Sequence, residues 1–406
     1  MVKYEDMFEA YYSCLRRKRG SMGAQKYFQG FEEDLIALTD EINSRSYQIG
    51  VSTAFLVYKP KLREIFAANF RDRIVHHYVI GRLEPLFEQM YDNRTFNCRK
   101  DKGVLYGVKM LRRDIQECSD GYTQDCWVMK MDLQGFFMSI DKRLLLEKLE
   151  RFIEERYHGE DKGEVMWLTE KIVLHAPEKN CVRRSEMSEW DALPKNKSLF
   201  TCGEGLGMPI GNLTSQHFAN FLLYGLDAYI DSLGFKHHGR YVDDFYVVSR
   251  DKAYMLESVG KIRVFLRREL HVGLHPDKFY IQHYSKGVAF TGAVIKFGRI
   301  YPARRTVYNF MLSIRELNKA YTREGIEKCL SSVNSYLGQL LHMDAYGVKR
   351  KVLAGITRKT WKKIYAKGSF RSLHQRRSWR CKEKVREENW LRVYYAKDLN
   401  DHTIDL

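Results

Sequence analysis

Several features that would narrow the class of this protein are missing from its sequence. The eight cysteines are scattered and none forms a Cys-x-x-Cys pair, so neither a zinc knuckle, a thioredoxin-type motif nor a disulfide framework is indicated. No apolar run is long enough to cross a membrane, and residues 1–6 lack the apolar core of a signal peptide. Internal repeats and low-complexity linkers are also missing. We therefore expect a soluble, cytoplasmic protein without a membrane partner.

Acidic residues are too few to balance the basic ones. The 406 residues include 68 Lys and Arg against 51 Asp and Glu, which gives a formal charge of +17 and a pI near 9.3. Lys and Arg gain affinity for nucleic acids because phosphates release counterions when they bind. A polyanion is therefore the expected partner, and the chain is long enough for two or three modules.

The stretch around Asp243 and Asp244 predicts a β-hairpin with two adjacent carboxylates at its turn. Tyr241 and Val242 precede the pair, and a β-rich run, residues 245–248, follows it. Asp tolerates the positive φ of tight hairpin turns, so we place the turn at Asp243 and Asp244. An isolated Asp-Asp pair is more often an exposed turn. Between apolar strands, however, two carboxylates repel each other unless a cation lies beside them.

A third carboxylate lies about a hundred residues upstream. Residues 127–132 read as a strand that ends at Asp132, and Asp141 is expected to cap the following helix. Together with Asp243 and Asp244, this completes an acidic set suited to two Mg²⁺ ions, with Mn²⁺ as a substitute. We predict that Asp132 and Asp243 bridge the ions, that Asp244 holds the nucleophile-side ion, and that the Leu133 carbonyl is a further ligand.

Other stretches suggest how nucleic acid is held. A hairpin is predicted over residues 51–70, with Lys59, Lys61 and Arg63 at a tip suited to closing over a triphosphate. A glycine-punctuated loop runs into a helix at residues 215–230, with Thr214 or Ser215 as its cap. Residues 252–269 read as a helix. From residue 304 onward the pattern is helical, and residues 345–380 hold twelve Lys or Arg and no acid. This basic stretch predicts a phosphate track that includes Lys349, Arg350 and Lys351.

The Tyr-x-Asp-Asp hairpin resembles that of reverse transcriptases, and the block at residues 70–103 is similar to the fingers of the bacterial enzymes. Most of these enzymes carry Gln-Gly-x-x-x-Ser-Pro in the loop that contacts the template and the incoming nucleotide. Here that loop begins with Ile210 and Gly211 and ends with Ser215 and Gln216, which resembles the reverse transcriptases of diversity-generating retroelements. Further likeness lies in residues 197–200 and 335–338. Retron and group II intron enzymes fit less well, because they keep the Gln-Gly and Ser-Pro forms.

The resemblance implies an α+β right-hand polymerase. Its palm is a ferredoxin-like antiparallel sheet with helices, beside fingers and a helical thumb. We expect an N-terminal helical segment (two helices) at 1–50, fingers at 51–125 and a palm at 126–295 with an insertion near 155–205. A thumb at 296–370 and a basic to mixed-charge tail at 371–406 complete the chain.

The family pattern also assigns roles to individual residues. Phe137 matches the aromatic gate that excludes a 2′-hydroxyl, although a plain core position is the alternative. Lys278 matches the lysine that protonates or neutralises the leaving pyrophosphate. Ile210 replaces a glutamine and would lower fidelity, unless it merely packs against the helix that follows. The nucleotide- and template-binding residues implied by these motifs and by the hairpin tip are Lys59, Arg63, Arg99, Leu133, Phe137, Ile210, Gly211, Gln216 and Tyr241.

The sequence is thus predicted to encode an RNA-directed DNA polymerase. It would copy a template-repeat RNA into cDNA with errors at template adenines, for hypermutation of a target gene (mutagenic retrohoming). Its partners would be template RNA, the RNA–cDNA duplex, dNTPs and a small basic helical accessory protein, which could be oligomeric. A reverse transcriptase of a defence system or of another retroelement is the alternative. A non-catalytic RNA-binding scaffold fits the intact aspartates poorly, and an RNA-dependent RNA polymerase would usually carry Gly-Asp-Asp.

Overall fold

The computed structural model describes residues 1–16, 18–58 and 61–376. The chain divides into two compact units, Met1–His283 and Tyr284–Leu406, and each is described by itself. The division at residue 284 falls inside the range 126–295 expected for the palm, and the bounds of the palm stay a prediction. No helix among the described residues is long and apolar enough to cross a membrane.

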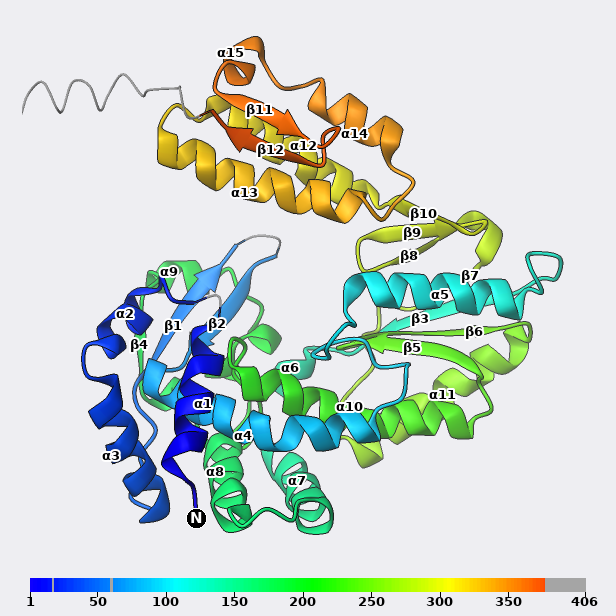
Figure 1. Ribbon diagram of the computed structural model, residues 1–406. Coiled ribbons are helices and arrows are strands. Elements are labelled where there is room, and N and C mark those ends of the chain that lie inside the picture. Colours follow the sequence, from blue (N-terminus) through cyan, green and yellow to red (C-terminus); the bar gives the residue numbers. More distant parts are fainter. Residues whose placement is uncertain (17, 59–60, 377–406) are drawn as a thin grey trace, which may run out of the picture. The chain divides into compact units, whose positions relative to one another are not determined.

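The N-terminal unit begins with three helices where two were expected: α1 (Tyr4–Leu15), α2 (Met22–Phe28) and α3 (Phe31–Asn43). They pack around the long helix α4 (Phe70–Met90), and the buried apolar residues of α1, α3 and α4 belong to one hydrophobic core. Arg71 of α4 binds Asp34 and Glu41 of α3 and so ties the two helices together. The blue N-terminal helices lie side by side in Figure 1.

The expected hairpin is confirmed as β1 (Ser52–Val57) paired antiparallel with β2 (Arg63–Ala67). A third strand, β4 (Cys181–Arg183), pairs parallel with the other edge of β1. Strand β4 comes from the segment expected as an insertion. This segment contains α8 (Lys162–Leu174), the short helix α9 (Met187–Trp190) and single turns η1 (Pro177–Lys179), η2 (Lys195–Lys197) and η3 (Leu199–Thr201). Part of the insertion is therefore built into the sheet of the β1–β2 hairpin, which was expected to belong to the fingers.

The second sheet of this unit has four antiparallel strands in the order β5-β6-β3-β7. They are β3 (Trp127–Asp132), β5 (His237–Tyr241), β6 (Asp244–Ser249) and β7 (Tyr280–His283). Helices α10 (Leu213–Ser232) and α11 (Lys252–Glu269) share a core with one face of the sheet, whereas α5 (Val104–Cys118) covers the other (Figure 1). Residues 245–248 are accordingly all buried, as expected for a strand covered on both faces.

Three local predictions can be compared directly with this unit. Helix α11 spans the expected residues 252–269, and Asp141 caps α7 (Lys142–Arg156) by accepting from the Arg143 and Leu144 amides. Helix α10 was expected to be capped by Thr214 or Ser215, and this was wrong. The helix begins at Leu213 after Asn212, because both hydroxyl residues already lie inside its buried first turn.

The C-terminal unit starts with η4 (Tyr284–Lys286) and a three-stranded sheet of β8 (Val288–Phe290), β9 (Ala293–Lys296) and β10 (Arg299–Pro302). Helices α12 (Arg304–Lys319), α13 (Arg323–Leu340), α14 (Tyr346–Leu353) and α15 (Arg358–Trp361) follow. Residues of α12, α13 and α14 form a separate hydrophobic core. The chain then makes a hairpin of β11 (Ile364–Lys367) and β12 (Ser372–Gln375), so the basic stretch is not helical throughout. Most of the expected tail lies outside the described residues.

Candidate active site

Strand register brings the three predicted aspartates to one end of the four-stranded sheet. Asp132, the last residue of β3, is paired with Asp244, the first residue of β6. Asp244 is paired on its other side with Tyr241, the last residue of β5. Asp243 lies in the turn between β5 and β6, and its carbonyl accepts a hydrogen bond from the Leu133 amide at 3.3 Å. The prediction that these carboxylates act together therefore has a geometric basis in neighbouring backbone positions.

The turn itself differs by one residue from the expectation. Its two central residues are Val242 and Asp243, and Val242, not an aspartate, has the positive φ of 57°. Such a conformation is strained for a β-branched residue. It is held from both sides. The Val242 amide donates to Asn97 Oδ1 at 2.9 Å, and its carbonyl accepts from Arg240 Nη1 at 3.3 Å.

A buried charge network lies directly behind this turn. Arg240 is fully buried and donates to both carboxylate oxygens of Asp227, with 2.7 Å between Nε and Oδ1. Its Nη1 also donates to Asn220 Oδ1, and Thr95 Oγ1 donates to Asp227 Oδ2 at 2.8 Å. A buried ion pair with these extra hydrogen bonds leaves few unsatisfied groups, so it can fix the backbone that carries Asp243. Sequence reasoning missed this role. The available signal was an arginine directly before the Tyr241-to-Asp244 stretch.

Two lysines lie against the carboxylates. Lys278, on the loop before β7, forms an ion pair with Asp132, and its side chain is half exposed. Lys130, two residues before Asp132 on β3, lies 2.9 Å from both carboxylate oxygens of Asp244. Lys278 was predicted to act at the site; the structure places it beside Asp132, and its role stays a prediction. Lys130 was not predicted, although two residues along a strand return a side chain to the same face of the sheet.

The carboxylates nevertheless remain short of positive charge. Burial, together with the neighbouring Asp132 carboxylate, raises the pKa of Asp243 to about 6. Burial also raises the pKa of Asp244, against the opposing effect of Lys130. Oδ1 of Asp132 is buried without a hydrogen-bond donor among the described residues. An all-oxygen set that is buried, repulsive and partly unpartnered fits hard divalent cations, and Asp132, Asp243 and Asp244 are the residues that would hold them.

The predicted selectivity residues lie together on a second, apolar side of the site. The apolar cluster consists of the buried residues Ala54, Phe66, Met138 and Leu199, and partly buried Phe137, Ile210, Phe200, Trp190, Cys181 and Cys202 pack against it. Phe137 belongs to the short helix α6 (Phe136–Ser139), which follows the turn after Asp132. The Ile210 carbonyl accepts from the Phe66 amide of β2 at 2.8 Å. Gly211 has a φ of 124°, and an added Cβ would lie 2.8 Å from the Phe66 carbonyl oxygen, so this position requires glycine.

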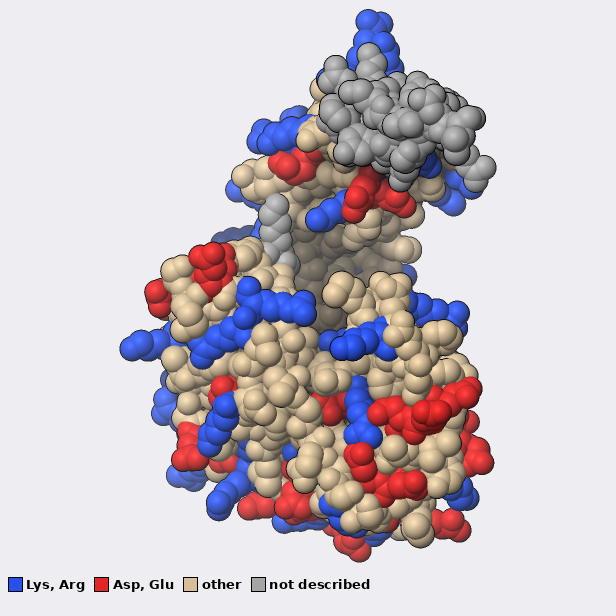
Figure 2. Space-filling view, turned by 90° about the vertical axis from the view of Figure 1, so that its left-hand side faces the viewer, with Lys and Arg blue, Asp and Glu red and all other residues tan. Residues whose placement is uncertain are grey.

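Cations of the β1–β2 hairpin were predicted to meet the triphosphate. Arg63 is exposed at the start of β2. Burial raises the pKa of Tyr241, while the Arg63 charge opposes this rise, so Arg63 lies within electrostatic range of the Tyr241 side chain. Lys59 lies outside the described residues. Figure 2 shows Lys and Arg side chains across the upper part of this face of the N-terminal unit, with an acidic group at its upper left corner, whereas both kinds of charge are mixed in the lower half.

Several other predicted residues make no hydrogen bond or ion pair with the three aspartates within the part of the chain that the structure describes. The Arg99 guanidinium is almost fully buried and engaged with Glu88 and with backbone carbonyls at residues 91–95, so it braces the end of α4. Gln216 accepts a weak hydrogen bond from the Cys98 thiol at 3.6 Å. Lys349, Arg350 and Lys351 lie on α14 of the C-terminal unit, where Arg350 and Lys351 are exposed.

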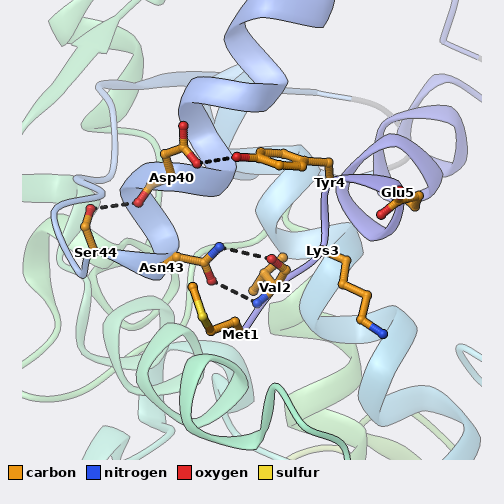
Figure 3. A pocket seen from close by; sticks show the side chains of 8 residues that line it. All are labelled: Met1, Val2, Lys3, Tyr4, Glu5, Asp40, Asn43 and Ser44. Carbon is orange, nitrogen blue, oxygen red and sulfur yellow. Dashed lines mark hydrogen bonds between the residues drawn. The ribbon is translucent and has the colours of Figure 1, made fainter.

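Two other features could be mistaken for sites. Asp114, Glu117 and His237 bring potential metal ligands within 4.8 Å of one another. However, the buried Asp114 carboxylate already accepts from Arg94 at 2.9 Å and from the Tyr246 hydroxyl at 2.6 Å, which favours a structural network. A hollow of about 540 Å³ lies beside α1 and α3 (Figure 3). Asn43 there binds both the Val2 amide and the Val2 carbonyl, and so anchors the first residues of the chain.

A family match covers more than half of the chain, including Asp132, Asp243 and Asp244. Residues 57–295 match the reverse transcriptase (RNA-dependent DNA polymerase) family. The chain belongs to this family, and its mixed α/β fold provides the fingers and palm of a right-hand polymerase.

Particular relatives are distant. Protein YkfC of Escherichia coli strain K12 is 23% identical over 296 residues, which cover 64% of this chain and 70% of that protein. Among solved structures, telomerase of Candida albicans with a fragment of telomeric RNA is 11% identical, with a TM-score of 0.44 and coverage of 75% of this chain and 55% of that one. Apo telomerase of Candida tropicalis is 12% identical, with a TM-score of 0.46 and coverage of 77% of this chain and 56% of that one. The chain thus spans little more than half the length of these telomerase chains.

Proposed function

We propose that this protein synthesises cDNA on an RNA template by two-metal phosphoryl transfer at Asp132, Asp243 and Asp244. The observation that carries the proposal is the pairing of Asp132 with Asp244 beside the strained turn that presents Asp243. Bound Mg²⁺ ions would activate the primer 3′-hydroxyl and neutralise the charge on the triphosphate. Asp132 and Asp243 would bridge the two ions, and Asp244 would hold the nucleophile-side ion. The Leu133 carbonyl is our further candidate ligand.

The surrounding residues have separable roles in this proposal. Lys278, beside Asp132, would give a proton to the leaving pyrophosphate or neutralise its charge. Phe137 would exclude a 2′-hydroxyl by occupying the space below the sugar. Arg63 and Gly211 would border the incoming nucleotide from the fingers side, while Tyr241 and Gln216 would contact the nucleotide or template.

The finer proposal is a retroelement enzyme that diversifies a target gene by error-prone copying at template adenines. It is supported by Ile210, by Ser215 and Gln216, and by the similar motifs at residues 197–200 and 335–338. A small basic helical accessory protein, working with the template RNA in the cytoplasm, belongs to the same proposal. A reverse transcriptase of a defence system is the competing assignment.

The polymerase activity is tested by primer extension on RNA with Mg²⁺ and dNTPs. Asp243→Asn should reduce extension by several orders of magnitude, because it removes one negative charge from the ligand set and keeps the side-chain shape. Circular dichroism and RNA-binding affinity should stay close to those of the wild type. Extension by Asp243→Asn at the wild-type rate would refute the metal-site assignment.

The retroelement assignment is tested by measuring misincorporation opposite each template base for the wild type and Ile210→Gln. A glutamine can restore polar contacts worth roughly 1 kcal/mol each, so fidelity should rise about fivefold. Errors at adenine no more frequent than at other bases would favour the defence assignment. Adenine errors that persist in Ile210→Gln would preserve the assignment and reduce Ile210 to a packing role.

A further inference from the structure

A turn of the insertion lies directly against the turn that follows Asp132. Gly135, at the start of α6, has a φ of 55°, and an added Cβ would lie 2.7 Å from the backbone oxygen of Asn196 in η2. This close approach leaves no room for a side chain at position 135. The insertion therefore reaches the edge of the active site, although it is far from Asp132 in sequence.

The same turn is fixed on its other side to the fingers sheet. The Ser198 hydroxyl and the Leu199 amide both donate to the buried Glu64 carboxylate of β2 at 2.6 Å. Within the turn, the Lys197 amide donates to the Pro194 carbonyl at 2.8 Å, and Thr201 Oγ1 donates to the Lys195 carbonyl at 2.6 Å. The backbone at residues 195–197 is thus held in place between the palm turn and the strand that begins with Arg63.

This fixed turn carries two cations without partners. Lys195 and Lys197 are exposed, and within residues 1–16, 18–58 and 61–376 neither ammonium makes a hydrogen bond or an ion pair. Other lysines of this region are engaged: Lys179 pairs with Glu204, and Lys142 donates to the His175 carbonyl. Two free ammonium groups on a constrained turn would meet a phosphate group without first breaking internal ion pairs.

We propose that Lys195 and Lys197 bind the β- and γ-phosphates of the incoming nucleotide and the pyrophosphate formed from them. The proposal rests on the proposed polymerase function, which puts a metal-bound triphosphate beside Asp132 and hence beside the turn that Asn196 contacts. The lysines would add to the positive charge of Arg63, whose strand is joined to this turn by the Glu64–Ser198 hydrogen bond. The insertion would then be part of the substrate site.

The test is steady-state primer extension by Lys195→Gln, Lys197→Gln and the double variant. The KM for dNTP should rise several-fold in each single variant and about tenfold or more in the double variant, while kcat changes less than about twofold. In pyrophosphorolysis, the reverse reaction, the KM for inorganic pyrophosphate should rise in parallel. The matching Lys→Arg variants should retain near-wild-type KM values, and Lys179→Gln, an exposed lysine of the same segment, should behave like the wild type.

Affinity for template RNA, measured by fluorescence anisotropy at several salt concentrations, should not change. Unchanged KM values for dNTP and pyrophosphate in the double variant would overturn the proposal. Weaker RNA binding with a smaller salt slope and unchanged KM values would also overturn it, because the lysines would then contact the template backbone. Extension by the wild-type protein is measured in the same experiment, so failure of the polymerase assignment would be recognised separately.

Discussion

The two sides of the active site are held by different forces. On the acidic side, the Val242 amide and carbonyl have partners in Asn97 and Arg240, and Arg240 is itself fixed by Asp227. On the apolar side, Phe137 and Ile210 are positioned by packing in the apolar cluster. Removing a hydrogen bond leaves a buried polar group unsatisfied, whereas a loss of packing can be partly regained by relaxation. Substitutions on the acidic side should therefore lower the catalytic rate strongly. Substitutions on the apolar side should change nucleotide selectivity more gradually.

Apart from removal of a catalytic carboxylate, the largest effect should follow from removing the partner of the strained turn. Asn97→Ala leaves the Val242 amide without an acceptor, so Asp243 should shift from its position. We expect kcat to fall about 10- to 100-fold with little change in the KM for dNTP. Single-turnover extension at saturating primer–template measures this change.

The control for this prediction is Val242→Gly. Glycine adopts positive φ without strain, so the turn should depend less on Asn97. In the Asn97→Ala background, Val242→Gly should recover part of the rate. If Asn97→Ala lowers kcat equally in the wild-type and Val242→Gly backgrounds, Asn97 acts through something other than the turn.

A smaller effect is expected on the apolar side. Phe137→Ala should increase ribonucleotide incorporation relative to deoxynucleotide incorporation by about tenfold, because a 2′-hydroxyl gains space. The ratio of the two kcat/KM values is the measurement. Phe136→Leu is the matched control, since it removes packing volume from the neighbouring buried residue and should leave this ratio unchanged. Unaltered discrimination in Phe137→Ala would show that Phe137 is simply a core residue.

A moderate effect on stability should arise from the buried Asp243 carboxylate on the acidic side. The pKa of Asp243 is raised from 3.8 to about 6 in the metal-free protein. The folded state then holds an extra proton between these values, so stability should fall as the pH rises through this range. At pH 7.5 with EDTA, Asp243→Asn should be more stable by on the order of 1–2 kcal/mol.

Thermal unfolding with and without Mg²⁺ measures this effect. Mg²⁺ should raise the Tm of the wild type more at pH 7.5 than at pH 5, where Asp243 is protonated. The Asp243→Asn protein should show a much smaller rise at both pH values. If the variant is no more stable than the wild type in EDTA at pH 7.5, burial and repulsion of the Asp243 carboxylate do not destabilise the folded protein.

The smallest effect should come from basic residues of α14, which belong to neither the acidic nor the apolar side of the active site. Replacing Lys349, Arg350 and Lys351 of α14 with Gln should reduce the salt slope of RNA binding by up to about three, because each phosphate that a cation neutralises adds roughly one unit to the slope. Lys319→Gln, which removes a lysine paired with Glu316 on α12, is the control. An unchanged slope in the triple variant would show that these charges only face solvent.

Local sequence patterns predicted the strands that end at Asp132 and begin at Asp244, because apolar runs and acidic ends are short-range signals. The exact turn was missed by one residue. Hairpin rules favour Asp over Val at positive φ, and only distant Asn97 and Arg240 make the strained Val242 acceptable. The place of η2 could not be read from the sequence either, since it depends on Gly135 and Glu64, both far from Asn196 along the chain. Pairings within one hairpin were predictable from local patterns. Among distant segments, only the meeting of Asp132 with Asp243 and Asp244 was predicted, from the chemistry of three carboxylates.

The parallel pairing of β1 with β4 also bears on how the chain folds. The β1–β2 hairpin can form early, since its strands are neighbours in sequence, but Ser52 meets Cys181 only after the intervening chain has been synthesised. Strand β3 lies within that interval. During synthesis, the free edge of β1 is therefore open to wrong partners until β4 arrives, and completion of this small sheet is a late, high-contact-order event.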